Sequence, residues 1–302
     1  MCRPNFFIVG APKCGTTSLL AYLLEHPDVY APGTWEFNFL NDDLTWISEP
    51  PIRSEEEYLS HFQTDDDYRR VGEKSAFYLF SERAPNRIYD LNPQAKIICI
   101  FRDPVEVMWS LYRYHLQAQR ENITSFERAL EAEGDRKEGR RIPEQANFVE
   151  DLLYRNVVRY TDQLERYLGI FGREDIHVIL FRDLVNYTDR VYKEVLRFLE
   201  VEPISLDSYK PHNTSPDVVG TEVRRLLGKY PVVQSALRTV FPSRVKEGIK
   251  KLLGEISGGE PIGEKKIRSE TRVMLNKEFR SEAKRLEELL GRDLSHWCMP
   301  VE

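Results

Sequence analysis

Cysteine is scarce in this sequence, and long apolar runs are missing. Only four cysteines occur among the 302 residues, and they are scattered at Cys2, Cys14, Cys99 and Cys298 without a Cys-X-X-Cys pair. This spacing fits neither a disulfide framework nor a zinc site, so a reducing, cytoplasmic location is predicted. The apolar stretch near the N-terminus, Phe6–Val9, is too short for a secretory signal or a membrane span, and neither is predicted.

An excess of positive charge is also lacking. The formal net charge is −6, from 43 Lys and Arg residues against 49 Asp and Glu residues. A dedicated nucleic-acid-binding protein is usually basic, so nucleic acid is not an expected partner. The six histidines show no His-Glu-X-X-His or other paired spacing, and no metal site is predicted. Hydrophobic residues make up 41% of the chain, which suffices for the core of a single domain spanning 1–302.

Short apolar runs alternate with helical patterns along the chain. Strands are predicted at four apolar stretches, Phe6–Val9, Val71–Glu73, Lys96–Phe101 and Ile176–Phe181. Helices are predicted at about Thr16–Glu25, Pro104–Leu116, Val149–Phe171, Asp189–Leu199 and Thr271–Leu290. Apolar strands separated by helices indicate a central parallel sheet flanked by helices, which defines the α/β class. The charged region 120–146 departs from this pattern, and we expect it to be solvated or mobile.

The loop that joins the first predicted strand to the first predicted helix has the composition of an anion-binding site. Glycine lets the backbone approach an anion closely, and a helix start offers unpaired N–H groups and a positive dipole end. The predicted anion ligands are Lys13, Cys14, Gly15, Thr16, Thr17 and Ser18. A helix capped after a tight turn is the simpler interpretation, but the lysine within the loop favours the anion site.

This loop differs from a nucleoside triphosphate site in one position. A Walker A loop places lysine directly after its second glycine, whereas Thr16 holds that position here. The loop is therefore a relative of a triphosphate cradle and not a copy of one. A P-loop small-molecule kinase and a non-catalytic nucleotide-binding protein stay open as alternatives.

A second candidate anchor follows the Lys96–Phe101 strand. Arg102 stands at the carboxyl end of that strand, where open α/β sheets bind their ligands. Asp103 is predicted to cap the next helix, with Glu106 completing a capping pair. Ser110, two helical turns further on, is expected to face the same anion as Arg102. A surface salt bridge is the alternative role for Arg102.

The residues of both anchors resemble a known family. The segment APKCGTTSL resembles the 5′-phosphosulfate loop of sulfotransferases that use 3′-phosphoadenosine 5′-phosphosulfate (PAPS), and FRDPVEVMWS resembles their 3′-phosphate motif, with Arg102 and Ser110 at the matching positions. The similarity is closest to the heparan sulfate sulfotransferase-like branch and its bacterial relatives. It extends over HPDVYAPGTWEFNF, GEKSAFY, HNTS near residue 213 and GRDLSHW.

The resemblance implies the fold and the donor. We expect a P-loop nucleotide-kinase-like sulfotransferase fold, with PAPS as the sulfuryl donor, 3′-phosphoadenosine 5′-phosphate (PAP) as the product and no metal. The implied acceptor carries a hydroxyl or an amine and is a carbohydrate, a lipid or a small metabolite. Basic residues that cover the donor near 209–219 are not matched clearly, and Arg224 or Arg225 is the candidate substitute.

The resemblance also implies catalytic roles. Glu36 matches the general base of this branch, and Lys74 matches a catalytic lysine that acts together with Lys13. Asn38 stands where histidine is frequent, and Asn41 stands where a substrate-contacting aspartate can occur. These two residues and Tyr78 are the predicted acceptor contacts. Without the resemblance, the simpler interpretation is favoured for both residues: Glu36 as a solvated loop carboxylate, and Lys74 as a partner for Glu73 or for a helix end.

Overall fold

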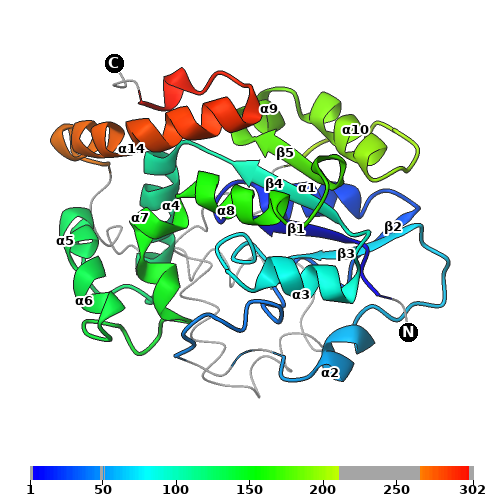
Figure 1. Ribbon diagram of the computed structural model, residues 1–302, viewed down its shortest axis with the longest axis horizontal. Coiled ribbons are helices and arrows are strands. Elements are labelled where there is room, and N and C mark those ends of the chain that lie inside the picture. The colour runs from blue at the N-terminus through cyan, green and yellow to red at the C-terminus, as the bar shows by residue number, and fades with distance from the viewer. Residues whose placement is uncertain (1–2, 48–49, 51, 211–265, 299–302) are drawn as a thin grey trace, which may run out of the picture.

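Five parallel strands form the centre of the molecule. The computed structural model describes residues 3–47, 50, 52–210 and 266–298. Within this part of the chain the strands follow the order β2-β3-β1-β4-β5, and every neighbouring pair is parallel (Figure 1). Their bounds are β1 Phe6–Gly10, β2 Val29–Tyr30, β3 Arg70–Lys74, β4 Lys96–Phe101 and β5 Ile176–Leu180. The predicted single-domain α/β class is confirmed.

The central strands β1 and β4 form because their side chains are apolar on both faces. All five residues of β1 are buried, and in β4 only Lys96 is even partly exposed. Cys99 is fully buried within β4, where it acts as a small apolar side chain. The register pairs Ile8 with Lys74 on one side and with Ile98 on the other. The carboxyl ends of β3, β1 and β4 therefore meet at one edge of the sheet.

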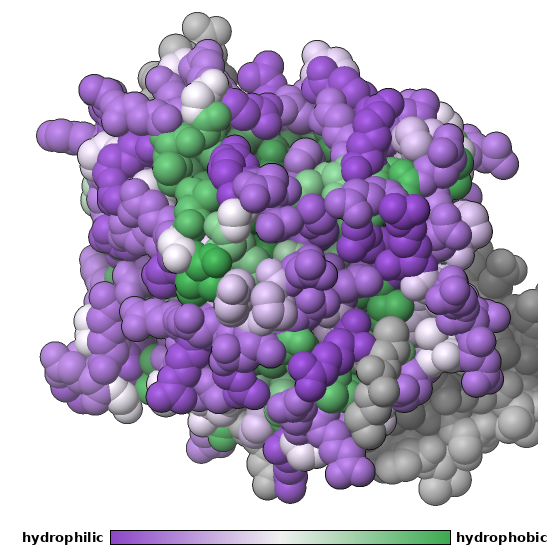
Figure 2. Space-filling model, turned by 45° about the vertical axis from the view of Figure 1, so that its right-hand side comes forward, coloured by the Kyte–Doolittle hydropathy of each residue, from purple (hydrophilic) through white to green (hydrophobic). Residues whose placement is uncertain are grey.

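Helices cover both faces of this sheet, with α1 behind it and α3 in front of it in Figure 1. The β1–α1–β2 crossover runs toward one edge of the sheet and the β3–α3–β4 crossover runs toward the other, so right-handed connections place α1 and α3 on opposite faces. The α-helices are α1 Thr16–Leu23, α2 Glu55–Ser60, α3 Ala84–Leu91, α4 Pro104–Gln117, α5 Phe126–Glu131, α6 Glu133–Lys137, α7 Tyr154–Val157, α8 Tyr160–Leu168, α9 Phe181–Asn186, α10 Thr188–Phe198 and α14 Ser269–Leu290. Short 3-10 helices lie at Val149–Leu152, Arg173–Asp175 and Ser295–Cys298. The surface in Figure 2 is mainly hydrophilic, with smaller apolar areas between polar side chains.

Most predicted elements agree with the structure to within a few residues. The helices expected at 16–25, 104–116, 189–199 and 271–290 correspond to α1, α4, α10 and α14. The strand expected to end at Phe181 ends one residue earlier, because Phe181 begins α9. None of the described helices is long and apolar enough to cross a membrane. The HNTS segment and Arg224 and Arg225 lie outside the described residues.

The long helix predicted over Val149–Phe171 is wrong. The chain forms a 3-10 helix, α7 and α8 here, with breaks at Leu153 and Arg159 where ψ is 68°. Side chains take over the backbone groups that the second break leaves unpaired. Gln163 Nε2 donates to the carbonyl oxygens of residues 156 and 157, and Glu282 Oε1 accepts from the backbone N–H of Thr161 at 2.7 Å. The apolar spacing alone could not reveal these long-range substitutes.

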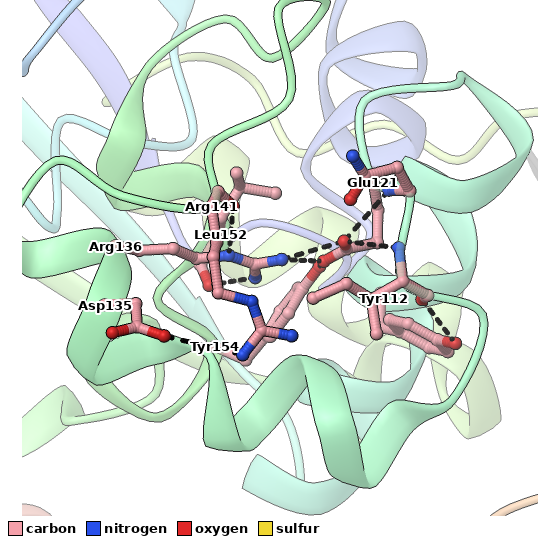
Figure 3. Close-up of polar contacts among 9 residues, drawn as sticks. Tyr112, Glu121, Asp135, Arg136, Arg141, Leu152 and Tyr154 are labelled. Atoms are coloured by element: carbon pink, nitrogen blue, oxygen red, sulfur yellow. Dashed lines mark hydrogen bonds and ion pairs between the residues drawn. The ribbon is translucent and has the colours of Figure 1, made fainter.

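The prediction of a solvated region over 120–146 is also wrong. This region contains α5 and α6, and its Arg136 is fully buried (Figure 3). Arg136 Nη2 contacts both carboxylate oxygens of Glu121, at 2.8 and 2.7 Å, and Nη1 donates to the carbonyl oxygen of Leu152 at 3.1 Å. The Tyr154 hydroxyl donates to Glu121 Oε2 at 2.8 Å. Full hydrogen bonding allows this charged pair to lie in the interior.

Candidate active site

Three cationic side chains meet at the carboxyl edge of the sheet. Lys13 follows β1, Lys74 is the last residue of β3, and Arg102 follows β4. Because β3, β1 and β4 are neighbours, their ends form one site, at the edge where open α/β sheets bind ligands. Arg102 Nη1 donates to the carbonyl oxygen of Lys13 at 3.3 Å. The two predicted anchors are therefore parts of one surface.

The loop after β1 delivers the start of α1 to this edge. Gly15 precedes the helix with φ +86°, a left-handed conformation that favours glycine. A Cβ atom at Gly15 would lie 3.2 Å from Phe181 and from Leu184, so a larger residue would also be crowded. No side chain caps α1. The N–H groups of Thr16, Thr17 and Ser18 in its first turn are thus available to an anion, and we call them the candidate anion cradle.

Cys14 contributes only its backbone to the cradle. The thiol is fully buried, and burial raises its pKa to about 12, so it stays protonated at neutral pH. Its sulfur lies 3.4 Å from the carbonyl oxygen of Pro12. The predicted anion-binding role of Cys14 is therefore restricted to its N–H group.

Lys13 is held in an environment rich in positive charge. Its Nζ lies 4.4 Å from the centre of the Tyr114 ring, which α4 places beside the loop. Burial lowers the pKa of Lys13, and nearby Arg102 and Lys74 lower it further, whereas Glu36 raises it. An anion bound between these cations would relieve their repulsion.

Glu36 and Lys74 form the second half of the site. Lys74 Nζ lies 2.8 Å from Glu36 Oε1 and 3.2 Å from the Thr17 hydroxyl oxygen. The Lys74 side chain is 5% exposed and that of Glu36 is 31% exposed, so the carboxylate faces the outside of the site. The alternative pairing of Lys74 with Glu73 does not occur, because successive side chains of β3 point to opposite faces.

Arg102 is already oriented by its surroundings. Its guanidinium lies over the Phe181 ring, 4.8 Å from the centre, and Nη2 lies 3.3 Å from Glu106 Oε2. Asp103 caps α4 as predicted, with Oδ1 accepting from the N–H of Glu106 at 3.0 Å. The capping role predicted for the Glu106 side chain is wrong, because that side chain pairs with Arg102 and with Arg272 of α14.

Two further predicted site residues are Ser110, on the nucleotide side, and Asn38, on the acceptor side. Ser110 is half-buried on α4, two turns after Arg102. Asn38 lines a cavity of about 660 Å³. Other residues along the walls of this cavity are Phe39, Asp42, Trp46, Arg53 and Arg87. Among the described residues, no group of His, Cys, Asp and Glu side chains is arranged to hold a metal ion.

Asn41 and Tyr78 do not fit their predicted role as acceptor contacts. Both side chains are fully buried. Asn41 Nδ2 donates to Asn38 Oδ1 at 3.2 Å, and this hydrogen bond orients the Asn38 side chain in the cavity wall. The Tyr78 hydroxyl accepts from the backbone N–H groups of Phe39 and Leu40. Both residues therefore shape the loop that carries Glu36.

Four residues of this region were not found from the sequence: Tyr114, Phe181, Arg272 and Glu73. A signal existed for Phe181, because the triplet Phe181-Arg182-Asp183 repeats Phe101-Arg102-Asp103 after a second strand. No local pattern points to Arg272, which reaches the site only through the packing of α14 against α4.

The start of α1, three cationic side chains and a carboxylate–lysine pair thus gather at one edge of a parallel sheet. Comparison with known proteins specifies the class of protein. A family profile described as a sulfotransferase domain matches residues 3–215, which is most of the chain. The chain therefore belongs to the sulfotransferase family, as the resemblance implied.

Known relatives share both sequence and fold with the chain. It is 24% identical to the membrane-associated sulfotransferase kil1 of Dictyostelium discoideum over 76% of its length, and 27% identical to the human bifunctional heparan sulfate N-deacetylase/N-sulfotransferase 3 over 86% of its length. It spans 63% and 30% of these two relatives. A crystal structure of a sulfotransferase from Alicyclobacillus acidocaldarius is 30% identical, with a TM-score of 0.72 over 99% of this chain and 100% of that one. The predicted sulfotransferase fold is confirmed.

Proposed function

We propose that this enzyme transfers the sulfuryl group of PAPS to an acceptor hydroxyl or amine, with Glu36 as the general base. One observation carries the proposal: Lys74 Nζ contacts both the Glu36 carboxylate and the hydroxyl of Thr17 in the anion cradle. A base and an anion cradle that share one lysine are what in-line transfer from a phosphate leaving group requires.

The residues at the sheet edge suit the two charged ends of the donor. Lys13 and the N–H groups of residues 16–18 would hold the 5′-phosphosulfate, and Arg102 with Ser110 would hold the 3′-phosphate. Burial lowers the pKa of Lys13 most, and Arg102 and Lys74 lower it further; a bound anion would offset these effects, which supports this assignment. In PAPS the sulfur is bonded through an oxygen atom to the 5′-phosphate, and this phosphate is a good leaving group.

Each protein group has one task in the proposed reaction. Glu36 accepts the acceptor proton while the acceptor oxygen or nitrogen bonds to sulfur and the bond from sulfur to the phosphate oxygen breaks. Lys13, Lys74 and the cradle N–H groups stabilise the charge that develops on the departing phosphate. A sulfuryl group carries less negative charge than a terminal phosphoryl group, so the reaction depends less on a metal.

The acceptor side is the cavity of about 660 Å³ that Asn38 shares with aromatic and charged side chains. We infer a carbohydrate as the first acceptor class to examine. The names of relatives support this choice, since they include a carbohydrate sulfotransferase 15 and a heparan sulfate glucosamine 3-O-sulfotransferase 5. Lipids and small metabolites with a free hydroxyl or amine form the other two classes. A cytoplasmic location stays a prediction.

A transfer assay with sulfur-labelled PAPS tests the proposal across carbohydrate, lipid and small-metabolite acceptors. We expect label in at least one acceptor class and release of PAP in equal amount. Binding of PAPS without transfer to any class would instead support a non-catalytic relative. Preferential binding of magnesium-ATP, with no contribution from a 3′-phosphate, would support the kinase alternative.

A further inference from the structure

A buried carboxylate lies directly beneath the loop that carries Glu36. Glu73 belongs to β3, next to Lys74, and its residue is only 1% exposed. Three hydroxyl groups donate to it: Tyr58 at 2.6 Å, Tyr78 at 2.9 Å and Ser75 at 2.9 Å. A carboxylate that accepts three hydrogen bonds is well satisfied in its ionised form.

Two of these hydroxyls also hold the backbone that follows Glu36. The Ser75 oxygen accepts from the N–H of Asn38 at 3.1 Å. The Tyr78 oxygen accepts from the N–H groups of Phe39 at 3.2 Å and Leu40 at 3.3 Å. A hydroxyl has one hydrogen, and the backbone amides occupy the acceptor side of each oxygen. The hydrogens of Ser75 and Tyr78 must therefore point at Glu73.

We propose that Glu73 is a positioning residue for Glu36. Its ionised carboxylate fixes the direction of the Ser75 and Tyr78 hydroxyls, these fix the backbone of residues 38–40, and the loop thereby holds the Glu36 carboxylate against Lys74. An apolar side chain would fill the same space at a lower desolvation cost, but it would leave both hydroxyls without direction. The inference rests on the proposed role of Glu36 as general base.

The arrangement makes the loop sensitive to pH. Burial raises the pKa of Glu73 to about 7, its three hydroxyl donors lower it, and the nearby charge of Glu36 adds to the rise. The other charged groups around it are Lys74, which points to the opposite face, and Arg87, which acts on Tyr58 from α3. A protonated Glu73 brings its own hydrogen, so one of the three hydroxyls loses its acceptor. Turnover should therefore rise with pH through about 7.

Amide hydrogen exchange tests this relay without using activity. In Tyr78→Phe and Glu73→Gln, the peptide that contains residues 38–40 should exchange about two- to tenfold faster than in the wild type, the range for one lost hydrogen bond. Tyr58→Phe is the matched control, because Tyr58 donates to Glu73 but contacts none of these amides, and its ring packing is kept. Unchanged exchange in Glu73→Gln, or the same acceleration in Tyr58→Phe, would overturn the proposal.

Kinetics test the positioning role. Glu73→Gln should lower kcat by about tenfold to a hundredfold, as small misplacements of a catalytic group do, with the Kd for PAP unchanged. The rising limb near pH 7 should disappear in this variant. If Glu73→Gln does not fold, Ser75→Ala removes the link to Asn38 together with one of the three donors to Glu73, keeps the Tyr78 link, and should lower kcat with PAP binding kept. Full turnover in a folded Glu73→Gln or Ser75→Ala variant contradicts the positioning role. Full turnover in Glu36→Gln instead contradicts the proposed general base, and the hydrogen-exchange experiment then tests the Glu73 contacts independently.

Discussion

Arg102→Ala provides a quantitative test of how the nucleotide is bound. The change removes a guanidinium that is 25% exposed and already held over Phe181 and beside Glu106. Glu106 keeps Arg272 as a partner, so the local structure should survive the substitution. A charge-assisted hydrogen bond contributes about 1.5–3 kcal/mol, which corresponds to roughly a 10- to 150-fold change in Kd.

Calorimetry with two ligands isolates that contribution. PAP carries a 3′-phosphate, and adenosine 5′-phosphosulfate does not, so only PAP should bind about 10- to 150-fold more weakly to Arg102→Ala. Arg190→Ala is a matched control, since Arg190 lies over the Tyr187 ring and pairs with Glu194 four residues later, as Arg102 does with Glu106. The control should leave both Kd values unchanged. Equal weakening of both ligands by Arg102→Ala would refute the 3′-phosphate assignment.

Three further predictions concern stability and catalysis. The folded protein raises the pKa of Glu73 from its ordinary value of 4.5 to about 7, so the protonated residue contributes about 3 kcal/mol to the free energy of unfolding. This contribution is full below pH 4.5 and is lost as the pH rises to about 7. Urea unfolding of Glu73→Gln should lack this loss, and pH profiles that run parallel in the variant and the wild type would contradict it. Glu121→Gln leaves the buried Arg136 without its charged partner and should lower the free energy of unfolding by about 3–5 kcal/mol. Arg140→Ala, at an exposed ion pair, is the control and should change the free energy of unfolding by less than about 0.5 kcal/mol. Equal effects of the two variants would contradict a special contribution of the buried pair to stability. Lys74→Ala should lower kcat by about a hundredfold or more, since it removes the cation shared by base and cradle, and single-turnover rates near those of the wild type would exclude this role.

Local sequence signals were sufficient for four of the five strands and for the loop after β1, whereas the two-residue strand β2, Val29–Tyr30, was not predicted. Each of these signals can be recognised within a window of about ten residues. They are the apolar run in β1, the glycine and hydroxyl residues after it, and Arg102 at the end of β4. The order of the strands then brings Lys13, Lys74 and Arg102 together without further assumptions. This part of the site was predictable because parallel strands end at the same edge.

The errors share a different physical cause. In the sequence, Arg136 is one of many charged residues in a region that was expected to be solvated. Its burial is explained only by its partners Glu121 and Leu152. Tyr78 reads as an aromatic residue available to an acceptor, but its hydroxyl is occupied by Glu73 and by two backbone amides. In each case the deciding contact comes from a residue that is distant in sequence or from the backbone, and residue type alone does not indicate it.

Turnover of Glu36→Gln, measured beside its affinity for PAP, tests the central claim most directly. With labelled PAPS and an acceptor found in the transfer screen, kcat should fall by about a hundredfold or more, as loss of a general base predicts. The Kd for PAP should stay within about threefold of the wild-type value, because the cradle and Arg102 remain in place. Wild-type turnover in this variant would remove Glu36 from the chemistry and contradict the account.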